Sequence, residues 1–140
     1  MQASYLLIAS KKVIIFFTMP KAVLKSPPHA YRRSPCPVSC ALDIFGDRWT
    51  LLVIRDLHLG KTRFKDFLTS PEGIPTNILT DRLKRLLEHK VIIQVTDAGG
   101  SRHLAYQLTK KGEALMPIVK AMKEWGLSWE KGTKAALTQR

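Results

Sequence analysis

After residue 35, apolar residues recur mostly at intervals of three and four, the spacing that places side chains on one face of a helix. This pattern predicts a first helix from Pro37 to Phe45, because proline is favoured at the first helical position and Gly46 stops the run. A second helix is expected over residues 48–57, with Asp47 as its N-cap. The folded part of the chain therefore opens with two helices.

Two more helices follow with the same spacing. A short third helix is expected to be capped by Thr62 and to end before Pro71. A fourth helix begins at Pro75 or Thr76 and continues to Glu88. Its buried face is predicted from a leucine stripe, formed by Leu79, Leu83, Leu86 and Leu87.

The pattern then changes from helical spacing to strands. Residues 91–96 are rich in β-branched side chains, and residues 104–108 alternate in polarity, so two strands joined by a turn at 97–101 are expected. Thr109 then caps a long last helix, which Gly126 is expected to kink or break. The apolar positions of this helix are Leu115, Ile118, Val119, Met122, Trp125 and Trp129.

This order of elements predicts a mainly α fold with a small β-hairpin (an α+β protein), namely a winged helix-turn-helix. Residues 35–131 form that domain, residues 1–34 are a basic leader and linker, and residues 132–140 are a frayed tail. In such a fold one helix enters the major groove and the preceding helix anchors it from behind. The pair over 64–68 and 76–88 fits these two roles.

The fourth helix carries a polar face opposite its leucine stripe. The side chains expected to contact bases are Asn77, Thr80, Asp81 and Lys84, with Thr76 beside them. Those expected to contact the DNA backbone or to form the wing contact are Arg82, Arg85 and Arg102, of which Arg82 lies nearest the core edge. The alternative is that these residues form a solvated helix face with no ligand.

Composition and charge favour the DNA interpretation. The chain has 140 residues, 45% of them hydrophobic, which is enough for one domain with a sizeable core. Its net charge of +12 favours a polyanionic partner, nucleic acid first and an anionic membrane surface second. Half of that excess lies on residues 1–34, but residues 76–111 also carry a local +4 around the fourth helix and the wing.

The leader has an apolar run that is not a membrane span. Lys11 and Lys12 interrupt residues 5–17, and neither the length nor the flanks fit a spanning helix or a signal peptide. Met19 is a second plausible start. Residues 1–18 are therefore either a translation-start artefact or loose arm, or a real interaction segment.

Several short segments in a fixed order resemble the HxlR family of winged-helix transcriptional regulators, between about Cys36 and Trp129. The segments are Cys36–Val38, Phe45–Leu52, Arg55–Leu57, Arg63–Phe64, Gly73–Ile74, Leu79–Lys84, Tyr106–Thr109 and Gly112. The resemblance implies a homodimeric bacterial repressor or activator that dimerises through its first and last helices. The dimer interface is accordingly expected at Leu115, Ile118, Met122, Trp125 and Trp129. The competing interpretation of this stripe is a core within one chain.

Cys36 is the candidate for oxidant or electrophile sensing. It lies at a helix start, where the helix dipole favours a thiolate, and Arg32 and Arg33 are near it in sequence. Some members of the resembling family sense oxidants through a cysteine at this position. The alternative is a cysteine that packs against a dimer partner.

Other chemistry has little support in the sequence. The four histidines and two cysteines have no metal-site spacing, and no phosphate loop or nucleophile elbow is present, so we expect no metal, no cofactor and no enzyme. We therefore predict a cytoplasmic homodimer that binds a palindromic operator in double-stranded DNA, with an oxidant or small molecule as effector and no membrane partner. The rival classes are a winged protein-interaction module that does not bind DNA, and a membrane-surface protein that uses the leader.

Overall fold

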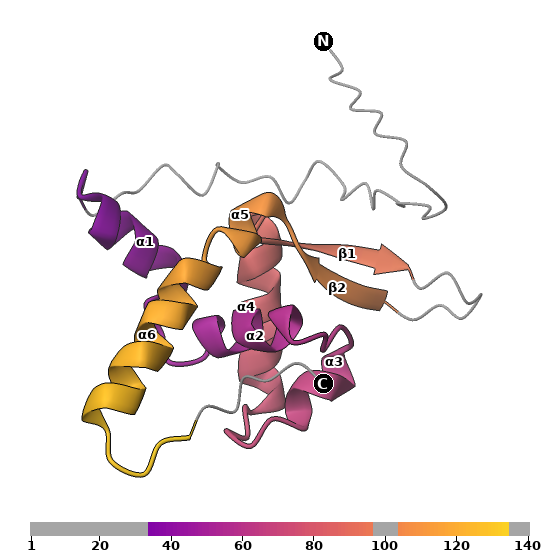
Figure 1. The fold of residues 1–140 in the computed structure, drawn as a ribbon. Coiled ribbons are helices and arrows are strands. Elements are labelled where there is room, and N and C mark those ends of the chain that lie inside the picture. Colours follow the sequence, from indigo (N-terminus) through magenta and orange to yellow (C-terminus); the bar gives the residue numbers. More distant parts are fainter. Residues whose placement is uncertain (1–33, 97–103, 135–140) are drawn as a thin grey trace.

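A computed structural model describes residues 34–96 and 104–134. Its elements are α1 (Pro37–Phe45), α2 (Thr50–His58), α3 (Phe64–Leu68), α4 (Thr76–Glu88), β1 (Ile92–Thr96), β2 (Leu104–Leu108), α5 (Lys110–Glu113) and α6 (Met116–Trp129). In Figure 1 the hairpin extends to the right of the helices, whereas α1 and α6 lie to the left. The predicted fold, mainly helical with one small hairpin, is confirmed.

Two predicted helix starts differ in detail from the structure. Helix α2 begins at Thr50, with Trp49 as the formal N-cap, but the Asp47 carboxylate still accepts the backbone N–H groups of both residues at 2.9 and 3.0 Å. The expected Thr62 cap of α3 is wrong. The carboxylate of Asp66 instead reaches back to accept the Arg63 N–H at 2.9 Å, because an acid in the first turn satisfies a donor the helix leaves free.

The core lies where α2, α3 and α4 meet the hairpin. Leu79, Leu83 and Leu86 are buried, as the stripe predicted, and they pack with Ile54 and Phe67 in one apolar cluster. Each such side chain contributes about 1.5–3 kcal/mol by leaving water. This burial fixes which face of α4 turns outward.

The hairpin is attached to the helices by both its strands. β1 and β2 pair antiparallel with Ile92 opposite Leu108, and β1 begins one residue later than predicted. The Tyr106 N–H donates to the Thr62 carbonyl at 2.7 Å, and the Tyr106 ring meets Phe67 edge to face at 6.3 Å between centroids. The predicted turn and Arg102 lie outside the described residues.

The predicted single last helix is wrong: the chain forms α5 and α6 with a break at residues 114–115. Thr109 does cap the first piece, since its hydroxyl oxygen accepts the Gly112 N–H at 3.2 Å. Pro117, in the first turn of α6, explains the break, because proline has no N–H and its ring clashes with a helix continuing from behind. Helix α6 then passes through Gly126 to Trp129 without the expected break.

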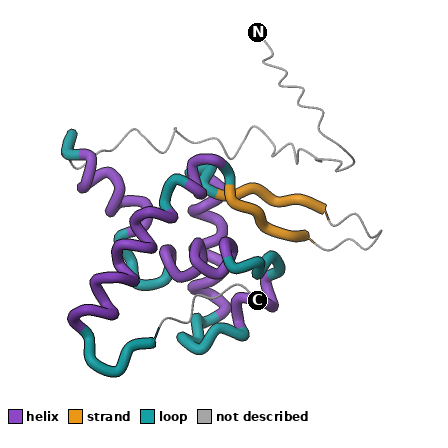
Figure 2. Tube along the Cα trace, in the orientation of Figure 1, coloured by secondary structure: helices purple, strands orange, loops and turns teal. Residues whose placement is uncertain are grey.

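The tube in Figure 2 follows the same arrangement, with the strands extending to the right from the helical body. Within residues 34–96 and 104–134, no helix combines the length and apolar character needed to cross a bilayer. The same part of the chain contains no cluster of His, Cys, Asp or Glu able to hold a metal ion.

Candidate nucleic-acid interface

The outward face of α4 carries the residues predicted to contact bases. Thr76, Asn77, Thr80, Asp81 and Lys84 are all exposed, opposite the buried leucines. The Thr80 hydroxyl donates to the Thr76 carbonyl at 2.8 Å, so its lone pairs remain available to accept. The exposed strip therefore offers both hydrogen-bond donors and acceptors, and the basic side chain of Lys84 lies one turn further along α4. Such a face suits base edges first and phosphates next.

The turn before α4 is held by an ionic network that begins on α2. Arg55 makes two parallel hydrogen bonds to Glu72, at 2.6 and 3.1 Å, and also bonds to Asp56. The buried Asp56 carboxylate also accepts from Lys61 at 3.3 Å and from the Ser70 hydroxyl. The network fixes the entry of α4 to the preceding helices.

The charges in this network shift the pKa values of their partners. The hydrogen bonds from Arg55 lower the pKa of Glu72, against a smaller opposing effect of burial. Hydrogen bonding to Glu72 and then to Asp56 raises the pKa of Arg55, despite its burial. In the sequence, Arg55 and Asp56 belong only to a short segment of the family resemblance, and this role was not predicted for them. The signal available in the sequence was Asp56, an acidic residue beside the apolar face of the second helix.

Two of the basic residues predicted to contact DNA, Arg82 and Arg85, make contacts inside the protein. The Arg82 side chain is 17% exposed, and its Nε lies 3.4 Å from an Asp47 carboxylate oxygen. Arg85 is half-buried, and its Nη2 donates to the Asp43 carbonyl at 2.8 Å. Arg82 does lie at the core edge, as its helical angle predicted.

Asp47 is the acidic centre of this corner. Burial acts to raise the pKa of its carboxyl, but hydrogen bonds from Thr50 and the backbone, together with the charge of Arg82, lower it overall. The Thr50 hydroxyl donates to the carboxylate at 2.5 Å. The carboxylate therefore both caps α2 and lies against α4.

Cys36 is exposed at the N-cap of α1, in the position predicted for it. Its backbone N–H donates to the Ser34 hydroxyl at 3.1 Å, and the Cys40 thiol donates to the Ser34 carbonyl at 3.3 Å. Both cysteines are free thiols, and Cys40 is half-buried. Cys36 is thus the more accessible of the two.

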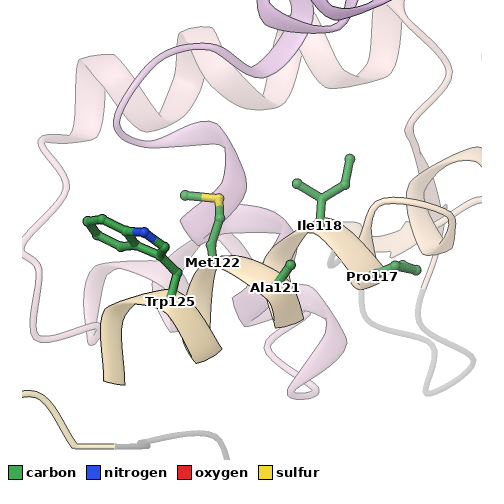
Figure 3. A pocket seen from close by; sticks show the side chains of 5 residues that line it. All are labelled: Pro117, Ile118, Ala121, Met122 and Trp125. Atoms are coloured by element: carbon green, nitrogen blue, oxygen red, sulfur yellow. The ribbon is translucent and has the colours of Figure 1, made fainter. Parts of the chain in front are cut away.

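Most of the apolar stripe of α6 is exposed on the chain, although Val119 is buried. Ile118, Met122 and Trp125 project from one side of the helix, and with Pro117 and Ala121 they line a groove of about 500 Å³ (Figure 3). Trp125 is 59% exposed and Trp129 73%. Leu115, by contrast, packs partly buried against the core. On α1, Val38 and Leu42 are also exposed.

An anchored helix with an exposed polar face, followed by a hairpin, defines a winged helix-turn-helix protein of the transcription-regulator class. Residues 44–134 match the model of the HxlR-like helix-turn-helix family, and the chain belongs to that family. The uncharacterised HTH-type transcriptional regulator sll1512 of Synechocystis is 31% identical over 94 residues, which are 67% of this chain and 70% of that protein.

Two solved structures share the fold. PA1607, a proposed transcription factor, is 39% identical with a TM-score of 0.69, and 78% of each chain is covered. The reduced form of the redox regulator HypR is 31% identical with a TM-score of 0.62, covering 69% of this chain and 95% of HypR. HypR has also been solved in an oxidised form.

Proposed function

We propose that this protein regulates transcription in the cytoplasm by binding a palindromic operator as a homodimer, with α4 in the major groove. The observation that carries the proposal is the exposed polar strip of α4 backed by the buried Leu79, Leu83 and Leu86. Asn77 is suited to adenine, and Lys84 to guanine or a phosphate. Arg102 is proposed to contact DNA from the wing.

The DNA proposal is tested by selecting duplexes from fragmented genomic DNA with the full chain and sequencing them. Selected duplexes are expected to share a palindrome with half-sites about one helical turn, roughly 34 Å, apart. The affinity of the protein for these duplexes should fall steeply with salt, because cationic side chains that contact phosphates release counterions from DNA. Failure to enrich any sequence over input would reject sequence-specific binding and favour an interaction module.

The homodimer is supported by the apolar faces of α6 and α1. Trp125, Trp129 and Met122 are each more than half exposed on the protomer, and α1 adds Val38 and Leu42. Exposed apolar surface of this kind is typical of an interface. A second copy would also supply the second recognition helix that a palindrome requires.

We further propose that oxidation at Cys36 changes operator affinity. Its support is the exposure of the thiol at a helix N-cap and the likeness to HypR, a redox regulator. In the simplest reaction, two Cys36 thiols from two protomers form one disulfide, and their two electrons and two protons reduce diamide to its hydrazine. The alternative product is a mixed disulfide between Cys36 and a small thiol.

Gel shifts with and without diamide test this proposal. The wild type and Cys40→Ser are expected to change operator affinity on oxidation. Cys36→Ser should have the same affinity with and without diamide. An identical response of wild type and Cys36→Ser would remove Cys36 as the sensor, even if operator binding itself is established.

A further inference from the structure

We infer that Arg82 and Arg85 are positioning residues, which fix the recognition helix to the corner between α1 and α2 instead of binding DNA themselves. The inference rests on the proposed function, because it assigns to α4 the role of entering the groove. It replaces the DNA-backbone role expected for these two residues from sequence.

The contacts of both arginines point toward the same corner. Arg85 donates from α4 to the Asp43 carbonyl, two residues before the end of α1. Arg82, one turn earlier on α4, pairs with Asp47 in the link between α1 and α2. Two successive turns of the recognition helix are therefore attached to the end of α1 and to the segment that follows it.

The burial of these side chains separates them from the DNA-facing strip. Arg82 and Arg85 are half-buried, whereas Lys84 between them is exposed. The Arg82 Nε and Nη1 atoms are buried and have no hydrogen-bond acceptor in the part of the chain that the structure describes. Such donors are costly to bury, so the carboxylates of Asp47, 3.4 Å from Nε, and Asp81, 3.7 Å from Nη1, compensate the guanidinium there.

The position of α1 is the other half of the argument. Of its residues only Phe45 is buried, at the end where the Arg85 contact lies. The start of α1 carries the exposed Cys36, and its outer face carries the exposed Val38 and Leu42. A displacement of α1 by dimer contacts or thiol chemistry would therefore reach α4 through the C-terminal end of α1, where Arg85 is bonded to Asp43.

The decisive measurement compares Arg85→Gln with Lys84→Gln in the full chain, on a duplex selected from genomic DNA. A residue that binds a phosphate contributes about one unit to the slope of log affinity against log salt, and its loss lowers affinity for all sequences. We expect this of Lys84→Gln. Arg85→Gln should keep the wild-type slope but lose about tenfold in preference for the selected duplex over a scrambled one. Arg85→Lys, which retains the charge but not the planar donor group, should resemble Arg85→Gln.

Hydrogen exchange of the free chain provides a test that needs no DNA. Exchange at residues 42–45 is expected to accelerate about fivefold in Arg85→Gln but not in Lys84→Gln, while exchange at β1 stays unchanged in both. For Arg82, a double-mutant cycle of Arg82→Gln with Asp47→Asn should show the double variant losing no more duplex preference than either single variant.

The outcomes separate the inference from the proposed function. A lowered salt slope in Arg85→Gln, with full binding restored by Arg85→Lys, would overturn the inference and make Arg85 a phosphate contact. If the wild type selects no duplex, the proposed function fails, and exchange at residues 42–45 decides the inference alone. Equal exchange in Arg85→Gln and Lys84→Gln would then reject it.

Discussion

At the scale of single residues, Lys90 has a backbone conformation that is costly for any side chain. Its φ is 56°, in the left-handed region, directly after α4. The Val91 N–H bonds to the Leu86 carbonyl and the Lys90 N–H to the Leu87 carbonyl, at 2.9 and 3.0 Å, which is the hydrogen-bond pattern of a Schellman motif. Glycine is the residue that this position favours.

Replacing Lys90 by glycine is therefore expected to stabilise the protein. The gain in the free energy of unfolding should be about 1 kcal/mol, because the left-handed strain disappears while the two capping bonds remain. Urea denaturation of wild type, Lys90→Gly and Lys90→Ala measures it. Lys90→Ala has the same Cβ as lysine and should show no comparable gain; equal stability of both variants would contradict the explanation.

Asn77 is the proposed base-contacting residue with the most specific expected partner, adenine. Asn77→Ala should weaken binding to the selected duplex by about 1–3 kcal/mol, roughly 5- to 150-fold, because a bidentate contact to a base is lost. Its salt slope should equal that of the wild type, and its affinity for a scrambled duplex should not change. Fluorescence anisotropy at several salt concentrations measures both quantities. A parallel loss on both duplexes would place Asn77 at a phosphate.

At the scale of elements, the turn between α3 and α4 is held by charge. The Glu72 carboxyl has a pKa lowered from 4.5 by its hydrogen bonds to Arg55, so the folded state favours the ionised form. The stabilisation is present above pH 4.5 and is lost as the pH falls through the lower pKa of the folded state. Because Glu72 is partly exposed, the effect at neutral pH should remain below about 1 kcal/mol.

Glu72→Gln is the corresponding variant. It should be less stable than the wild type at pH 7, and the difference should shrink toward zero in acid, where the wild-type carboxyl is protonated. Thermal denaturation between pH 3 and pH 7 follows this change. In an Arg55→Gln background the same substitution should have little effect at either pH. A difference that does not vary with pH would mean that Glu72 acts through packing alone.

Sequence reasoning succeeded for elements whose determinants are local. The leucine spacing predicted the buried face of α4, and the alternation after residue 91 predicted the hairpin. It failed at Pro117, where the apolar stripe continued across a break that the proline imposes. The pairing of Arg85 with Asp43 and of Arg82 with Asp47 joins residues 42 and 35 positions apart, so no local pattern in one sequence contains it.

At the scale of the whole molecule, the α6 groove predicts the effect of a charge in the proposed dimer interface. Trp125→Glu should convert the dimer to a monomer, because a carboxylate buried between two apolar faces costs several kcal/mol. Sedimentation velocity measures the change. Lys120→Glu is the matched control, since it lies on α6 about 200° around the helix from Ile118, and it should leave the dimer intact. A dimeric Trp125→Glu would place the interface elsewhere.

The same groove has a consequence for the life of a newly made chain. Under the proposed dimerisation, a newly made chain carries two exposed tryptophans on α6 until it meets another copy. At low expression that encounter is slow, and the uncovered surface is open to chaperones, proteases and aggregation. The number of chains that survive then rises more steeply than the rate of synthesis. The cellular level of the protein therefore depends on its own abundance before any operator is occupied.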